Sequence, residues 1–161
     1  MIPWTERGRA KSPTPPRNVV VTGASRGIGA ALAVRYAREG AALALIGRSS
    51  EALEAVAAEC RASGAESVVA EALDVRDHAA LSGRIAEFDR RRPIDLLIAN
   101  AGVTGGWSDP GAAETPEDSR RLMDINVTGA LNAVHAVLPA MLERGGGQIA
   151  LMSSIAAFVP L

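Results

Sequence analysis

Hydrophobic and polar positions divide the chain into two repeating kinds of segment. Short apolar runs predict strands at 19–21, 42–46, 67–73, 94–99 and 148–152. Between them, apolar residues return at every third or fourth position, as Ile28, Leu32 and Tyr36 do, which predicts helices. Strands that alternate with helices build a parallel sheet covered on both faces. The predicted fold class is therefore α/β, a doubly wound parallel sheet with strand order 3-2-1-4-5.

Capping residues predict where several helices begin and end. Ser50 is expected to cap a helix that stops at Gly64 and packs Cys60 into the core. The run 115–118, Thr-Pro-Glu-Asp, combines a capping hydroxyl, a proline at the first helical position and acids in the first turn. It predicts the start of a long helix that continues to about Arg144. The glycine-rich segment 100–115, which contains Trp107, is expected to be a substrate-side loop.

Composition narrows the class of protein. At 161 residues with 48% hydrophobic content and a net charge of −1, one soluble domain is expected, without a nucleic-acid or membrane partner. The single Cys60 and two separated histidines give no disulfide and no metal site, which fits the cytoplasm. Residues 1–17 are proline-rich and basic and are expected to form a disordered arm, so that the domain covers 18–161.

The segment Thr22–Gly29 carries the most informative chemistry. Its glycines let the backbone turn sharply from a strand into a helix and present bare amides at the helix N-terminus. The macrodipole there favours a pyrophosphate, so a dinucleotide is the predicted ligand. The Gly-Lys-Ser/Thr ending of nucleoside triphosphatases is not present in this segment, which argues against that class.

Five motifs in order resemble the short-chain dehydrogenase/reductase family over Asn18–Leu161. They are the T-G-x-x-x-G-x-G turn, Asp74, the Asn-Ala-Gly run at 100–102, Asn126 and Ser154. The resemblance implies a Rossmann-type NAD(P)-binding domain of an oxidoreductase that interconverts carbonyls and alcohols.

The resemblance assigns cofactor contacts to three segments. Asp74 is expected to accept a hydrogen bond from the adenine amino group, and Val75 to cover the ring. Arg48 follows the second strand where an NAD site usually has an acid, which together with Arg26 favours NADP over NAD. If Arg48 is a solvated surface residue, that preference disappears while the nucleotide remains. The full set of expected cofactor-binding residues is Thr22, Gly23, Ser25, Arg26, Gly27, Ile28, Gly29, Arg48, Asp74, Val75, Asn100, Ala101 and Gly102.

Catalysis is expected to use Asn126 and Ser154 on a small carbonyl or alcohol substrate. The family also uses a tyrosine and a lysine, but the only tyrosine here is Tyr36 and the only lysine is Lys11. The family's Tyr-x-x-x-Lys segment would fall beyond Leu161, so the 161 residues are expected to be an inactive fragment lacking strands 6 and 7. The full-length form is expected to be a homo-oligomer.

Three alternatives stay open at this stage. The first is a non-catalytic NADP-binding or interaction protein of the same fold. The others are a sugar-nucleotide epimerase of the extended branch, whose glycine turn differs by one residue, and a methyltransferase, which binds an adenosyl group without a pyrophosphate. His135 is expected to be a packing or surface residue rather than a base.

Overall fold

A computed structural model describes residue 15 and residues 17–104 and 114–154. Most of the predicted N-terminal arm, Trp107 and the last seven residues of the chain therefore lie outside the described part. Arg17, which the sequence assigned to the arm, is bound to the domain. Its amide donates to the Asp95 carboxylate at 2.9 Å, and its carbonyl accepts from the Ala42 amide at 2.6 Å.

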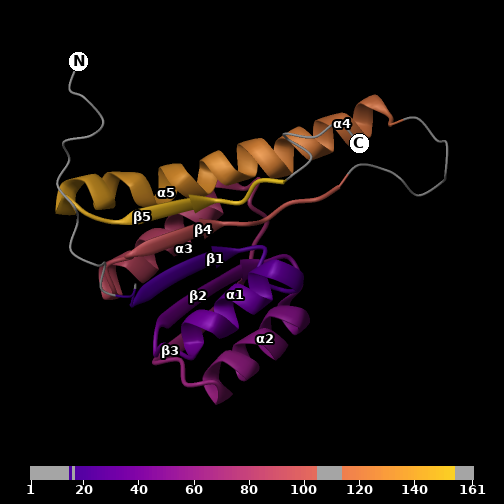
Figure 1. The fold of residues 1–161 in the computed structure, drawn as a ribbon. Helices are drawn as coiled ribbons and strands as arrows, with labels where there is room; N and C mark the ends of the chain where they lie inside the picture. Colours follow the sequence, from indigo (N-terminus) through magenta and orange to yellow (C-terminus); the bar gives the residue numbers. More distant parts are fainter. Residues whose placement is uncertain (1–14, 16, 105–113, 155–161) are drawn as a thin grey trace.

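The five strands form one parallel sheet in the order β3-β2-β1-β4-β5, as predicted (Figure 1). Every residue of β1 beyond the first, and all of β2 and β4, are buried, as expected for strands covered on both faces. The edge strands β3 and β5 are more exposed. The bounds are β1 Asn18–Thr22, β2 Ala42–Gly47, β3 Ser67–Ala72, β4 Leu96–Ala99 and β5 Gln148–Leu151.

Helices cover both faces of the sheet and create two separate cores. In Figure 1, α1 and α2 lie on one side of the sheet and α3 and α5 on the other. Cys60 of α2 is fully buried in the first core, as predicted, and burial raises the pKa of its thiol to about 11. Tyr36 is half-buried and packs against the same core. The helices are α1 Gly27–Ala37, α2 Ser50–Ala62, α3 His78–Arg91, α4 Pro116–Leu122 and α5 Gly129–Arg144.

The N-terminal cap of α2 differs from the prediction. Ser49, not Ser50, has extended backbone and accepts a hydrogen bond from the Ala52 amide at 3.3 Å. Ser50 is instead the first helical residue. A capping residue lies just outside the helix, and its side chain accepts from an amide two or three residues further along the chain. The prediction for α4 is confirmed, since Thr115 and Asp118 form a reciprocal capping box.

The long helix expected between Pro116 and Arg144 is interrupted by a π-helical segment, Met123–Thr128, between α4 and α5. No proline or glycine lies within this segment, so its sequence gives no signal of the altered winding. π-Helical turns widen the helix locally and are frequent at functional sites. The segment includes Asn126, which the resemblance assigns to catalysis.

The stretch Pro116–Arg144 is long and apolar enough, by length and composition alone, to cross a membrane. In the structure, one side of it has a packing role: Ala133, Val137 and Met141 are buried in the core shared with α3 and the sheet. Other positions along the stretch expose large hydrophobic residues, among them Met123, Val127, Leu131 and Leu142.

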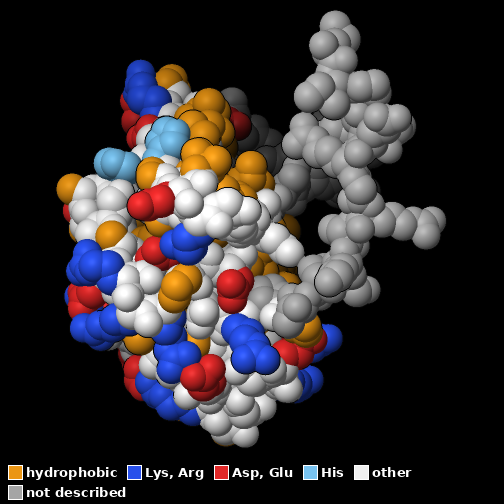
Figure 2. Space-filling model, turned by 90° about the vertical axis from the view of Figure 1, so that its left-hand side faces the viewer, with side chains coloured by type: hydrophobic (Ala, Val, Ile, Leu, Met, Phe, Trp, Pro, Cys, Tyr) orange, Lys and Arg blue, Asp and Glu red, His pale blue; other side chains and the backbone are white. Residues whose placement is uncertain are grey.

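Charges of both signs are mixed over the molecular surface. Figure 2 shows basic and acidic side chains interspersed over much of one face, while hydrophobic side chains gather near the top of the view. Among the described residues many of these charges form ion pairs, such as Arg144 with Asp89 at 2.7 Å. On this face, basic side chains therefore lie close to acidic ones.

Candidate functional site

The glycine turn connects β1 to α1 with very little space around it. Gly23 has φ +66°, a conformation that L side chains rarely adopt. A Cβ on Gly29 would meet the Gly23 carbonyl and would lie 2.6 Å from the amide nitrogen of the Asn100 side chain. These two positions therefore require glycine, because any side chain would push the turn away from β4.

The N–H groups in the first turn of α1 are available to an anion. No side chain caps it, and its first turn contains no acidic residue. The N–H groups of a first helical turn have no partners within the helix, and they carry the positive end of the macrodipole. The arrangement therefore provides several convergent donors next to a side-chain-free surface.

Thr22 and Asn100 fasten the carboxyl ends of β1 and β4 together. The buried Thr22 hydroxyl accepts from the amides of Asn100 and Ala101, both at 3.1 Å. The Asn100 side-chain amide donates to the carbonyls of Thr22 and Gly23, both at 3.2 Å. Thr22 therefore lies behind the site and supports it.

A cleft of about 290 Å³ opens in front of these residues, at the carboxyl edge of the sheet. All of the expected cofactor-binding residues except Thr22 and Gly29 line it. Sequence reasoning missed four lining residues, although two of them directly precede predicted ones. The lining comprises Gly23, Ser25, Arg26, Gly27, Ile28, Gly47, Arg48, Leu73, Asp74, Val75, Asn100, Ala101, Gly102, Val103 and Ile125.

One end of the cleft holds a carboxylate beside an apolar wall. Asp74 accepts from the Arg76 guanidinium at 2.7 and 3.0 Å and from the Arg76 amide at 3.0 Å. The side-chain hydrogen bond from Arg76 holds the pKa of Asp74 below its ordinary value, although partial burial acts in the opposite direction. Asp74 is therefore an ionised acceptor at neutral pH, next to the buried Val75. The sequence analysis missed Arg76.

Two arginines stand on the open side of the same cleft. Arg26 and Arg48 are both exposed, and within the described ranges neither forms a salt bridge. Arg48 is near enough to Asp74 to contribute to the lowered pKa of that carboxyl. Guanidinium groups in this position are suited to a phosphate.

The expected catalytic residues lie at the same sheet edge but outside the cleft lining. Asn126 clamps the backbone of Val103, accepting from its amide at 2.8 Å and donating to its carbonyl at 2.9 Å. Ser154 follows β5, which runs parallel to β4 and pairs Leu151 with Ala99. The structure thus places Ser154 at the carboxyl end of the strand beside the one that leads to Asn100.

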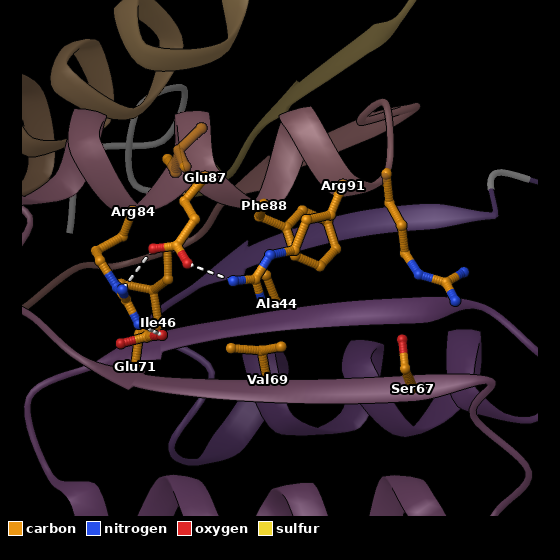
Figure 3. A pocket seen from close by; sticks show the side chains of 11 residues that line it. Ala44, Ile46, Ser67, Val69, Glu71, Arg84, Glu87, Phe88 and Arg91 are labelled. Carbon is orange, nitrogen blue, oxygen red and sulfur yellow. Dashed lines mark hydrogen bonds and ion pairs between the residues drawn. The ribbon is translucent and has the colours of Figure 1, made fainter.

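A second cavity of about 270 Å³ lies between α3 and the strands β2 and β3, and shares no lining residue with the cleft (Figure 3). Its floor is apolar, with Ile46, Val69 and Phe88. The charged groups around it are paired: Glu87 binds Arg84 at 2.6 Å and Arg91 at 2.7 Å, as the dashed lines in Figure 3 show. These cations already have partners, so the glycine-turn cleft is the stronger candidate site.

Comparison with known proteins identifies the family. Residues 17–161 match the short chain dehydrogenase family, and the chain belongs to it. A 3-dehydrosphinganine reductase of Arabidopsis thaliana is 42% identical over 142 residues, which cover 86% of this chain and 41% of that protein.

Solved structures agree with the family. NAD⁺-bound xylitol dehydrogenase superposes with a TM-score of 0.81 at 34% identity, covering 90% of this chain and 55% of that one. A metagenomic short-chain oxidoreductase in complex with NADP gives a TM-score of 0.80 at 33% identity, covering 90% of this chain and 65% of that one. The chain thus spans about two fifths to two thirds of the length of these relatives. The family match favours a dehydrogenase over the epimerase and methyltransferase alternatives.

Proposed function

We propose that the cleft binds NADP, with NAD as the weaker ligand, and that the protein is an oxidoreductase acting on a small carbonyl or alcohol. The observation that carries this proposal is the glycine turn, whose side-chain-free backbone lies against Asn100 at the head of an open cleft. The family membership and the two dinucleotide-bound relatives support it. Within the same proposal the location is cytoplasmic and the full-length form is a homo-oligomer.

The residues present fit a dinucleotide along the whole cleft. Amides of the turn around Gly27 would receive the pyrophosphate, and Asn100 and Gly102, which line the same cleft, would contact the ribose. At the other end, Asp74 offers an acceptor to the adenine amino group while Val75 covers the ring. Arg48 and Arg26 would hold a 2′-phosphate. A bound nicotinamide would supply the hydride donor or acceptor for the substrate carbon.

Asn126 and Ser154 would serve the reaction in different ways. Asn126 fixes the backbone of Val103, which lines the cleft, and so shapes the wall next to the reacting groups. Ser154 would donate a hydrogen bond to the substrate oxygen. Tyr36 lies on α1 against the core, so it is not placed to move a proton at that oxygen.

The cofactor preference is tested by measuring the Kd of NADPH and NADH by calorimetry. An arginine that binds a phosphate contributes about 1.5–3 kcal/mol, so Arg48→Gln should weaken NADPH roughly 10- to 100-fold and leave NADH nearly unchanged. Arg38→Gln is the matched control, because Arg38 follows α1 at the end away from the glycine turn. Equal affinities for the two cofactors would contradict the NADP preference alone, and binding of neither would contradict the whole proposal.

Turnover is a separate question from binding. We propose that these 161 residues bind the cofactor but do not convert substrate, because the lack of a general acid costs on the order of 10²–10⁴ in rate. An assay with NADPH and a panel of ketones and aldehydes checks this. Turnover well above the buffer background would contradict it.

A further inference from the structure

The base end of the cleft is built on a short turn that is held from behind by α5. The turn runs from Asp74 to Asp77, whose amide donates to the Asp74 carbonyl at 3.0 Å. Asp74 and Val75 face the cleft from this turn. Asp77 then caps α3, so the turn has little freedom to slide along the chain.

Gly129, the first residue of α5, contacts the back of this turn. A Cβ at Gly129 would lie 2.5 Å from Cγ2 of Val75, closer than real Cβ atoms approach, and 3.1 Å from its Cβ, which is a tight contact. Val75 is 6% exposed, so most of its surface is already packed. Its β-branched side chain is stiff about χ1 and cannot simply rotate away. A methyl group at position 129 would therefore push Val75 toward the cleft.

Asn132, one turn further along α5, fixes the backbone of the same segment. Its side-chain amide donates to the Val75 carbonyl at 2.9 Å and to the Arg76 carbonyl at 3.4 Å. Asn132 takes the donor role that water would otherwise take at these carbonyls, and the bonds hold the turn against the helix. Neither Gly129 nor Asn132 lines the cleft.

We propose that Gly129 and Asn132 are positioning residues. They fix how far the Asp74–Val75 segment projects from α5 into the cleft, and thereby the fit of the adenine ring. The inference rests on the proposed dinucleotide function and deepens it. Gly129 provides the space that lets Val75 sit back against α5, and Asn132 holds the backbone there. The Asp74 carboxylate is then held in one position, where it can accept a hydrogen bond from the exocyclic amino group of adenine.

The test measures the Kd of NADPH and of its deaminated analogue, which has hypoxanthine in place of adenine. Gly129→Ala should weaken NADPH by about tenfold and reduce the preference for adenine, because both Val75 and Asp74 move. Removing the clash should restore binding: Val75→Ala/Gly129→Ala should bind within about threefold of Val75→Ala alone. If Gly129→Ala only destabilised the fold, it would lower the Tm without changing the preference for adenine over hypoxanthine.

Gly83→Ala is the matched control. Gly83 is also a helical glycine, and a Cβ there meets nothing within 4 Å. Both substitutions gain helix propensity, so only the clash with Val75 distinguishes them. The control should bind NADPH as the wild type does.

Asn132→Ala provides a second variant that adds no clash, should Gly129→Ala fail to fold. It should weaken NADPH and lower the preference for adenine while remaining folded by circular dichroism. If the wild type binds NADPH and both variants match it in affinity and in preference for adenine, the inference is overturned. The proposed function would then stand. Failure of the wild-type chain to bind NADPH would instead overturn the proposed function.

Discussion

At the scale of single residues, the cleft depends on polar side chains that hold one another. Asp74 lines the cleft, but the Arg76 guanidinium fixes the orientation and charge of its carboxylate through three hydrogen bonds. The lowered pKa of Asp74 means that this pair contributes stability above the ordinary pKa of about 4. That contribution is lost as the pH falls through the lower pKa of the folded state.

Arg76→Gln is expected to raise the pKa of Asp74 toward its ordinary value, since the hydrogen bond from Arg76 is the main cause of the shift. A pH titration of the Asp74 side-chain carboxyl carbon by NMR measures this. Arg120→Gln is the control, because Arg120 pairs with Glu117 instead. An unchanged Asp74 midpoint in Arg76→Gln would show that another group keeps the carboxyl ionised.

At the scale of elements, capping residues predicted the starts of α2 and α4 to within one residue. The adjacent Ser49 and Ser50 have the same side chain, and only the backbone conformation decides which one caps α2. Ser49→Ala should therefore cost about 1 kcal/mol of unfolding free energy, and Ser50→Ala less than about 0.5 kcal/mol. Urea unfolding of both variants checks this, and a larger loss for Ser50→Ala would contradict the assigned cap.

The π-helical segment is an element whose local sequence gave no warning of it. Its Asn126 turns toward the chain after β4 and bonds both polar groups of Val103. Those bonds join two segments far apart in sequence, so they arise only in the folded molecule.

Asn126→Ala should speed hydrogen exchange at the Val103 amide by about tenfold, because the amide loses its acceptor. Asn126→Asp keeps an acceptor oxygen at that position and should preserve most of the protection. Exchange followed by NMR distinguishes the two variants. Equal rates in all three proteins would mean that Asn126 does not hold this backbone in solution.

At the scale of the whole molecule, the alternation of strands and helices was enough to predict the sheet order and the edge that carries the site. The glycine turn and the resemblance to the family singled out Gly23, Asp74 and Asn100, and parallel strands bring these residues, which follow β1, β3 and β4, to one cleft at one edge. Arg76 was missed although it lies only two residues from Asp74. Gly129 and Asn132 were missed because their roles depend on how α5 packs against the turn after β3. No local pattern reports such a contact.

We propose that phosphate oxygens of a dinucleotide rest on the amides where β1 turns into α1. A titration of the ¹⁵N-labelled chain with NADPH, followed through its backbone amide resonances, tests this directly. The largest shifts are expected at the amides of Gly27, Ile28 and Gly29, with smaller ones at Val75. Saturable binding that leaves the amides of the glycine turn unmoved, or no binding at all, would contradict the claim.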